Sequence, residues 1–273
     1  MPYTTWPCEI TGSPANPPLV LLHGFLGAGA DWRAVTERLQ ERYWCIAPDL
    51  PGHGRNRPAL PERPLTLRGL AGELRRSLQA LGAGPAHVLG YSLGGRLALH
   101  LALACPGQVR ALLLESASPG LENRRARAER RALDDRRAAE LRAQGMAAFL
   151  ETWYAMPLFA TLRRHPAALQ SLVHGRETND PAWMACILAD LSPGRQPALW
   201  KRLPGLRLPV LWLAGELDPA YAANLGRAAG LLPEVRTALA PYSGHNLHVE
   251  APEWFYRQVS GFLAQVDAES TGL

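Results

Sequence analysis

Short apolar runs alternate with amphipathic stretches in the first 115 residues of the chain. The runs have the length and continuous hydrophobicity of strands that are buried on both faces. They lie at residues 19–22, 44–47, 86–90 and 111–115. Between them, leucines at helical spacing predict a helix from Thr66 to about Leu81. Another helix is expected over about residues 32–41, with Asp31 as its cap. Strands that alternate with helices favour a parallel sheet covered on both faces.

The alternation stops at residue 120, and from there to about residue 203 the sequence is compatible with helices broken by glycine, proline and polar turns. It resumes with expected strands at 208–214 and 235–240 and expected helices near 220–231 and 252–265. We therefore expect one α/β core domain with a helical cap inserted in it. The expected boundaries are core 1–119 and 204–266, cap 120–203 and a frayed tail 267–273.

Composition places the chain among soluble globular proteins, with 47% hydrophobic and 19% charged residues. No apolar run approaches the roughly 18 residues that span a bilayer, and the N-terminus has neither the basic start nor the apolar stretch of a signal peptide. Cys8, Cys45, Cys105 and Cys186 are too scattered for a metal or disulfide framework. These features favour a cytoplasmic protein without a membrane partner. The net charge of +5 is modest, and no recognised module indicates nucleic-acid binding.

The stretch Gly-Tyr-Ser-Leu-Gly-Gly-Arg at 90–96 carries the pattern G-x-S-x-G between an expected strand and an expected helix. The flanking glycines permit a turn too sharp for larger side chains, so Ser92 is expected to stand exposed above the end of the strand. Its hydroxyl would then lie beside the free N–H groups of the following helix. We therefore interpret the motif as a nucleophile elbow.

A serine hydroxyl needs a base at neutral pH, and the base needs an orienting acid. Both acid candidates follow the strand expected at 208–214, and Asp218 is favoured over Glu216 because the longer turn lets it curl back towards the sheet. His245 is favoured as the base over His248, because it follows a glycine directly after a later strand. The predicted order Ser…Asp…His is the one expected of a nucleophile elbow.

Backbone N–H groups near Ser92 are expected to form an oxyanion hole. The first buried strand is followed at once by His-Gly-Phe, and the predicted donors are the N–H groups of Phe25 and Leu93. Such donors are worth about 3 kcal/mol each for a developing negative charge. His23 and His53 lie in glycine-flanked loops, so structural roles near the hole are expected for them.

Arginine is concentrated beside the predicted nucleophile and in the expected cap. Arg96 lies in the first turn after Ser92, where a buried guanidinium is costly unless an anion meets it. Residues 122–142 contain eight arginines and five acids. Most of this run is explained by a solvated helix face with ion pairs. One or two inward-facing arginines would be enough to bind carboxylates in fork geometry.

The elbow, the segment Asp49-Leu-Pro-Gly-His-Gly54 and the pair Gly244-His245 together resemble the α/β-hydrolase superfamily over nearly the whole chain. Four segments more specifically resemble the menaquinone-pathway synthases that make 2-succinyl-6-hydroxy-2,4-cyclohexadiene-1-carboxylate (SHCHC). They are the elbow at 90–96, Pro-Gly-Leu-Glu-Asn at 119–123, Trp-Tyr-x-x-Pro-Leu-Phe at 153–159 and Gly-His-Asn-Leu-His at 244–248. The resemblance implies the α/β-hydrolase fold, with a mostly parallel central sheet flanked by helices and an inserted helical cap.

The resemblance also implies a lyase reaction, in which pyruvate is eliminated from 2-succinyl-5-enolpyruvyl-6-hydroxy-3-cyclohexene-1-carboxylate to give SHCHC. In that reaction Ser92, polarised by His245 and Asp218, would remove a ring proton, and no metal or organic cofactor is implied. The substrate class is a small cyclic acid with three carboxylates, which gives buried arginines a partner. Substrate-binding roles are implied for Tyr91, Arg96, Arg130, Trp153 and Arg176.

Two other functions stay open at this point. One is a carboxylesterase or carbon–carbon bond hydrolase that acts through an acyl-enzyme on Ser92. The other is a catalytically silent binding protein, which is disfavoured because all three triad positions are filled. The oligomeric state is left open between a monomer and a weak homo-oligomer.

Overall fold

Seven strands form one sheet in the computed structural model, which describes residues 5–271. Their order is β1-β3-β2-β4-β5-β6-β7; β1 is antiparallel to β3, and all other neighbours are parallel. The strands are β1 (Cys8–Thr11), β2 (Pro18–Leu22), β3 (Trp44–Pro48), β4 (Ala86–Tyr91), β5 (Val109–Glu115), β6 (Val210–Gly215) and β7 (Val235–Ala240). The expected mostly parallel sheet is confirmed, and the edge strand β1 is an addition to it.

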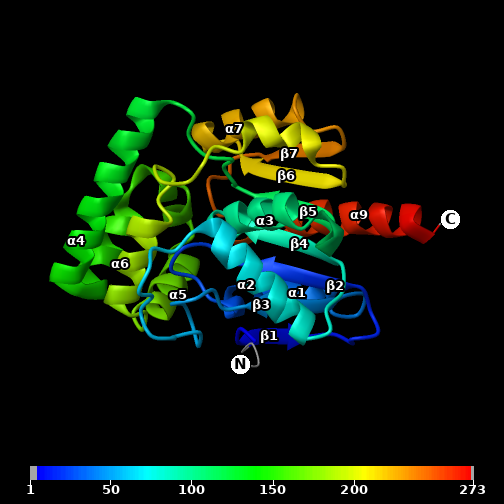
Figure 1. The fold of residues 1–273 in the computed structure, drawn as a ribbon, viewed down its shortest axis with the longest axis horizontal. Helices are drawn as coiled ribbons and strands as arrows, with labels where there is room; N and C mark the ends of the chain where they lie inside the picture. Colours follow the sequence, from blue (N-terminus) through cyan, green and yellow to red (C-terminus); the bar gives the residue numbers. More distant parts are fainter. Residues whose placement is uncertain (1–4, 272–273) are drawn as a thin grey trace.

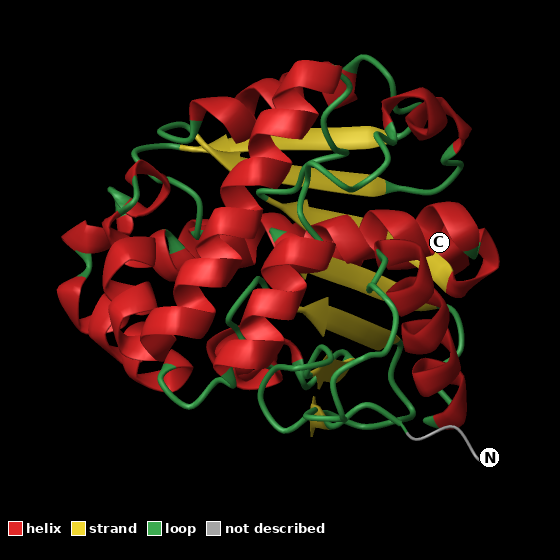
Figure 2. Ribbon diagram, turned by 60° about the vertical axis from the view of Figure 1, so that its left-hand side comes forward, coloured by secondary structure: helices red, strands yellow, loops and turns green. Residues whose placement is uncertain are grey.

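Helices cover both faces of the sheet (Figures 1 and 2). Val20 and Leu22 of β2 pack in the core that contains the buried faces of α2, α3 and α7, whereas Leu19 and Leu21 pack with α1 and α9. Because alternate residues of a strand point to opposite faces, burial of both faces requires an uninterrupted apolar run. The covering helices are α1 (Arg33–Leu39), α2 (Leu67–Ala80), α3 (Leu93–Ala104), α7 (Pro219–Ala229) and α9 (Pro252–Thr271).

The segment between β5 and β6 contains helices and no strand among the described residues. We call residues 120–203 the helical insertion; it lies beyond the carboxyl ends of the strands, at the left of Figure 1. Its longest helix, α4, is interrupted at Gly145, whose φ of 80° is not helical, so α4 consists of two helical pieces joined at a kink. The elements here are α4 (Arg124–Ala155), η3 (Pro157–Phe159), η4 (Leu162–Arg164), α5 (Pro166–Arg176), α6 (Pro181–Asp190) and η5 (Trp200–Gly205), which ends just beyond the insertion.

Two expectations about local structure are wrong. The tail expected from Asp267 is helical as far as Thr271, because α9 continues and Asp267 accepts a hydrogen bond of 2.7 Å from the Tyr43 hydroxyl. Residues 272–273 lie outside the described part of the chain. Asp31 does not cap α1, which begins at Arg33 without a side-chain cap. Asp31 lies instead within the short helix η1 (Gly29–Trp32). No helix in residues 5–271 is long and apolar enough to cross a membrane.

Candidate active site

Ser92 lies on a strained turn between β4 and α3. Its φ of 50° and ψ of −108° are unusual for a residue with a side chain, and such strain persists where the surroundings enforce it. A Cβ atom at Gly90 would overlap the backbone of Gly94, and one at Gly94 would overlap the carbonyl of Leu22. Both glycines are therefore required for the strand and helix to meet at this angle, with Ser92 at the apex.

Ser92, His245 and Asp218 form a continuous chain of hydrogen bonds. His245 Nε2 lies 3.0 Å from Ser92 Oγ, and His245 Nδ1 lies 2.7 Å from Asp218 Oδ2. Because the carboxylate can only accept, Nδ1 carries the proton and Nε2 is free to accept the serine proton. Asp218 directly precedes α7 and His245 follows β7, so both arrive at the same edge of the sheet as the elbow.

The alternative acid and base lie elsewhere. The Glu216 carboxylate accepts a hydrogen bond from the Tyr242 N–H and does not contact the histidine of the chain. His248 lies in the short helix α8 (Leu247–Glu250) and pairs with Glu115, at 2.8 Å between Nδ1 and Oε2. Of the sequence candidates, the structure thus joins only Asp218 and His245 to Ser92 by hydrogen bonds.

The N–H groups of Phe25 and Leu93 form no hydrogen bond within the described residues, which leaves both available to an oxyanion. The loops around them are held by histidines. His23 Nε2 accepts from the Leu50 N–H at 3.0 Å, and His53 Nε2 accepts from the Leu26 N–H at 3.2 Å. Burial lowers the pKa of both imidazoles, so they act as neutral acceptors that shape the loop.

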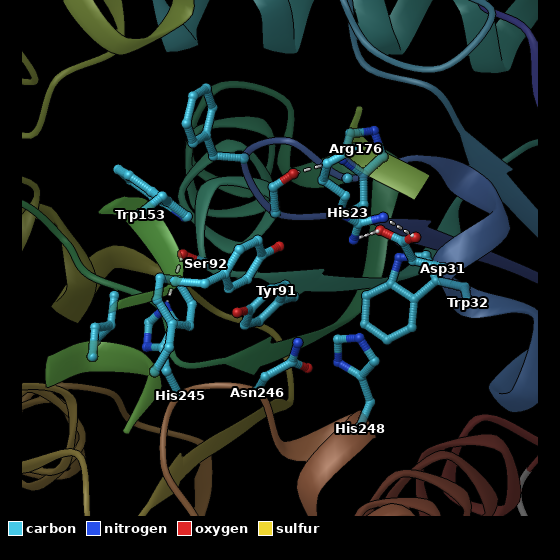
Figure 3. A pocket seen from close by; sticks show the side chains of 16 residues that line it. His23, Asp31, Trp32, Tyr91, Ser92, Trp153, Arg176, His245, Asn246 and His248 are labelled. Carbon is cyan, nitrogen blue, oxygen red and sulfur yellow. Dashed lines mark hydrogen bonds and ion pairs between the residues drawn. The ribbon is translucent and has the colours of Figure 1, made fainter. Parts of the chain in front are cut away.

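A cavity of about 50 Å³ lies over Ser92 (Figure 3). Tyr91, His245 and His248 line it from the core, and Trp153 and Arg176 line it from the helical insertion. The ring of Trp153 packs edge-on against the Phe25 ring, 5.1 Å between centroids. Burial, and next the charge of Glu115, hold the pKa of Tyr91 well above its usual range, so its phenol is neutral. The cavity therefore combines aromatic walls with a few polar groups.

Arg176 is the arginine that reaches this cavity, and it carries its own counter-ion. Its two terminal nitrogens lie 2.8 and 2.6 Å from the Asp31 oxygens in fork geometry, and both side chains are largely buried. Burial alone would raise the pKa of Asp31, but the guanidinium more than offsets this and holds it below its usual range. The pair thus places a fixed dipole at the cavity wall.

Arg96 and Arg130 do not line the cavity over Ser92. Arg96 is buried, and its guanidinium donates to the Gln196 side chain and the Leu191 carbonyl. Burial lowers its pKa to about 10, so it stays charged at neutral pH. It lines a different cavity, of about 850 Å³, between α2, α3 and the end of the insertion. Arg130 is partly exposed and pairs with Asp134 at 2.8 Å.

Tyr221 lies beside His245 and within electrostatic range of both arginines. Its ring packs on the ring of His245, 4.5 Å between centroids. Burial raises the pKa of Tyr221, and the charges of Arg130 and Arg96 act in the opposite direction. The two guanidinium groups are thus near enough to act electrostatically on Tyr221, but neither lines the cavity over Ser92.

Three features of the site were not predicted from the sequence. They are the counter-ion Asp31, the packing of Tyr221 on His245 and the buried pair Glu115–His248. A signal for the last one was present, because Glu115 is an acid at the end of a buried apolar strand, where a charge needs a partner. Within residues 5–271, no group of three or more His, Cys, Asp or Glu residues is arranged to hold a metal ion.

Comparison with known proteins identifies the family and the fold. A family model described as the alpha/beta hydrolase fold matches residues 17–252. A putative 2-succinyl-6-hydroxy-2,4-cyclohexadiene-1-carboxylate synthase of Bacillus subtilis is 33% identical over 256 residues, which cover 93% of each chain. The synthase of that name from Serratia proteamaculans is also 33% identical, over 92% of this chain and 95% of its own.

Solved structures place the same fold around the site. MenH from S. aureus superimposes with a TM-score of 0.91 at 32% identity, over 97% of this chain and 99% of that one. A thermophilic esterase from Thermogutta terrifontis reaches a TM-score of 0.81 at 24% identity, over 95% of this chain and 93% of that one, a likeness of fold alone. From sequence identity and coverage together, the chain belongs to the SHCHC synthase family of the alpha/beta hydrolase fold.

Proposed function

We propose that this chain is a lyase that eliminates pyruvate from 2-succinyl-5-enolpyruvyl-6-hydroxy-3-cyclohexene-1-carboxylate and releases SHCHC. The observation that carries the proposal is the chain of hydrogen bonds from Asp218 through His245 to Ser92, which ends at a cavity lined by aromatic side chains and Arg176. The names of the relatives supply the substrate. The protein would act in the cytoplasm without a metal or organic cofactor.

The names of substrate and product define the bonds that change. The ring double bond at C3 becomes a diene at C2 and C4, so C2 loses a proton and C5 loses its enolpyruvyl oxygen. The C2 proton lies next to the succinyl carbonyl, and its removal places negative charge on that carbonyl oxygen. The electrons then move through the ring, the C5–O bond breaks, and enolpyruvate leaves and takes up a proton to become pyruvate. No water is consumed.

The three hydrogen-bonded residues and the two backbone donors each have one role in this scheme. His245 Nε2 accepts the proton of Ser92 as Ser92 Oγ takes the proton from C2. Asp218 holds the Nδ1 proton and stabilises the imidazolium that forms. The N–H groups of Phe25 and Leu93 donate to the succinyl oxygen as its charge develops. Ser92 thus acts as a proton carrier, and no acyl-enzyme forms.

Substrate binding needs a larger space than the cavity over Ser92 provides. Pockets for small molecules are typically about 300–1,000 Å³, whereas the cavity over Ser92 is about 50 Å³. We propose that the helical insertion moves away from the core to admit the substrate. Tyr91, Trp153 and Arg176 would then contact it directly. Arg96 and Arg130 would contact it only if the space extended past Tyr221.

The test is an assay of purified protein with the enolpyruvyl precursor, in which pyruvate release is followed beside a panel of p-nitrophenyl esters. We expect pyruvate and SHCHC in equal amounts and slow or no ester turnover. Rapid ester turnover without pyruvate would favour the alternative, a carboxylesterase or carbon–carbon bond hydrolase that is acylated on Ser92. Inactivity on both would leave a binding protein of the same fold.

A further inference from the structure

The loop that carries the catalytic base brings a second polar side chain to the cavity. Asn246 directly follows His245 and lines the cavity over Ser92. The residue is 6% exposed, and Figure 3 shows its amide pointing into the cavity from the loop between His245 and His248. None of the proton-transfer steps described above uses this amide.

The backbone of Asn246 is held from both sides. Its N–H donates to Glu250 Oε1 at 3.0 Å, and its carbonyl accepts from the N–H groups of Val249, at 3.2 Å, and Glu250, at 2.8 Å. Asn246 occupies the N-cap of α8, a position at which asparagine commonly accepts a hydrogen bond from a helix N–H through its side chain. No such bond forms here. The side chain is therefore positioned by its backbone, but the fold does not use its amide.

Three residues of the cavity have a buried side-chain atom that finds no hydrogen-bond partner within residues 5–271. The atoms are Trp32 Nε1, Arg176 Nε and Asn246 Oδ1. The two nitrogens are donors, whereas the amide oxygen is an acceptor. A buried polar atom without a partner costs stability, and such an atom at a binding site is expected to find its partner in the ligand. Asn246 therefore calls for a ligand group that can donate a hydrogen bond.

The proposed substrate has one group that matches this amide. Its carboxylates, its succinyl ketone and its enol ether oxygen only accept hydrogen bonds, whereas the hydroxyl at C6 both donates and accepts. An amide also does both, so the match holds whichever way the oxygen and nitrogen of Asn246 are turned. Only one ring atom separates C6 from C2, so the group that binds the hydroxyl must lie beside the triad. Asn246 adjoins His245 in the chain and meets this condition.

We propose that Asn246 is a specificity-determining residue that binds the C6 hydroxyl of the substrate ring through its side-chain amide. The ligand class is a cyclic polycarboxylate with a ring hydroxyl, and its identity rests on the proposed function. The hydroxyl is present in both the substrate and the product, so Asn246 contacts both. The donors of Trp32 and Arg176 are left for carboxylate oxygens.

The first experiment compares the thermal stability of two variants of equally buried asparagines. Asn179 is also 6% exposed, but its Nδ2 donates to the Leu26 carbonyl at 2.8 Å. Asn179→Leu leaves that carbonyl without its donor and should lower the Tm by several degrees. Asn246→Leu removes an amide that the fold does not use, so its Tm should stay within about one degree of the wild type or rise. A fall in Tm as large as that of Asn179→Leu would make Asn246 a structural residue and overturn the proposal.

Isothermal titration calorimetry tests recognition of the hydroxyl without any turnover. The two ligands are SHCHC and 2-succinylbenzoate, which keeps both carboxylates and the ketone but lacks the ring hydroxyl. We expect Asn246→Leu to raise the Kd of SHCHC by about tenfold, and that of 2-succinylbenzoate by less than about twofold. Asn246→Ala, which removes the amide without adding apolar atoms, should show the same difference. Equal losses of affinity for the two ligands would overturn the proposal.

Steady-state assays of pyruvate release separate binding of the hydroxyl from an effect on the catalytic base. The hydroxyl takes no part in the bond changes, so its hydrogen bond to Asn246 should be equally strong in the bound substrate and in the transition state. We expect KM of Asn246→Leu to rise by about tenfold, with kcat within about threefold of the wild type. A fall in kcat with unchanged KM would show that Asn246 acts through His245 and does not bind substrate.

The combined outcomes distinguish the hydroxyl site from the proposed function. If the wild type releases no pyruvate but binds SHCHC with the expected dependence on Asn246, the proposed function fails and the hydroxyl site stands. If pyruvate is released and Asn246→Leu weakens both ligands equally, the hydroxyl site is refuted alone. A wild type that neither releases pyruvate nor binds SHCHC would refute both.

Discussion

The core wall of the cavity is fixed by backbone geometry, whereas the wall formed by the helical insertion is fixed by side-chain contacts. Gly90 and Gly94 allow the turn that holds Ser92 at φ 50°. Its partners Asp218 and His245 lie in the loops that follow β6 and β7. On the other side, Trp153 is held by ring packing, and Arg176 by its ion pair with Asp31. A wall held by side chains can move apart without unfolding the sheet.

This difference assigns separate duties to the two walls. Proton transfer needs atoms that stay within hydrogen-bonding distance throughout turnover, which the core supplies. Admission and release of a polyanion need a wall that can open, which the insertion supplies. Core substitutions are therefore expected to lower kcat, and substitutions in the insertion to raise KM. The kinetic experiments below compare these two effects.

The largest effect is expected for Ser92→Ala, which removes the proton carrier and leaves the cavity walls in place. We expect kcat for pyruvate release to fall by about a thousandfold or more, with KM little changed. Circular dichroism and the Tm would check that the fold is intact. A kcat within tenfold of the wild type would show that Ser92 does not carry the proton. It would also contradict the assignment of proton transfer to the core wall.

Asp218→Asn keeps the size of the orienting acid and removes its charge. The amide can donate to His245 Nδ1 and so favour the tautomer in which Nε2 is protonated and unable to accept from Ser92. We expect kcat to fall by about a hundredfold or more, again with little change in KM. Glu216→Gln, at the rejected acid candidate, is the matched control and should leave both constants unchanged.

Arg176→Gln tests the insertion wall. We expect KM to rise by roughly ten- to hundredfold, with a smaller change in kcat, because a charged contact to substrate is lost. The substitution also leaves Asp31 without its partner, so the double variant Asp31→Asn/Arg176→Gln is needed to restore stability. A double variant that also restores KM would show that Arg176 acts only on the fold.

Arg130→Ala should have a smaller effect, because Arg130 does not line the cavity over Ser92 and pairs with Asp134. We expect kcat/KM to fall by about three- to tenfold, as for a charge that acts at a distance. Arg125 on the same helix is the control, since it also pairs with an acid four residues on but is exposed. Equal kcat/KM values for Arg130→Ala and Arg125→Ala would show that Arg130 takes no part in substrate binding.

The smallest expected effect is the pH dependence of the free energy of unfolding that the Asp31–Arg176 pair contributes. The folded-state pKa of Asp31 is lowered by Arg176 against the opposing effect of burial. The pair thus stabilises the fold above the unfolded pKa of about 4, and this contribution is lost as the pH falls through the folded value. Urea unfolding should show the wild type more stable than Asp31→Asn/Arg176→Gln at pH 7, with a gap that narrows in acid. A constant gap would contradict the ionised pair.

The core could be predicted because its signals are local. The apolar runs of the central strands must be continuous, and the elbow must have glycine at positions 90 and 94, so both are visible in the sequence. Asp218 and His245 follow strands, and the parallel sheet brings such positions to one edge. The order of the motifs along the chain was enough to join Ser92 to its partners.

The insertion could not be predicted in the same detail because its arginines have several possible partners. The acid that pairs with Arg130 is four residues away, but the partner of Arg176 is Asp31, 145 residues away. Nothing in the sequence near Arg96 indicates that Gln196 will hold its guanidinium. Long-range pairing between charged side chains depends on how the helices pack, which the spacing of residues along one helix does not determine.

Intact-protein mass spectrometry during turnover tests the central claim most directly, that Ser92 carries a proton and is never acylated. The wild type would be mixed with the enolpyruvyl precursor, and samples quenched while pyruvate is still being released. We expect the mass of the chain to stay unchanged at every time point. A transient adduct in the wild type that is absent from Ser92→Ala would contradict the account and make the protein a hydrolase of the same fold.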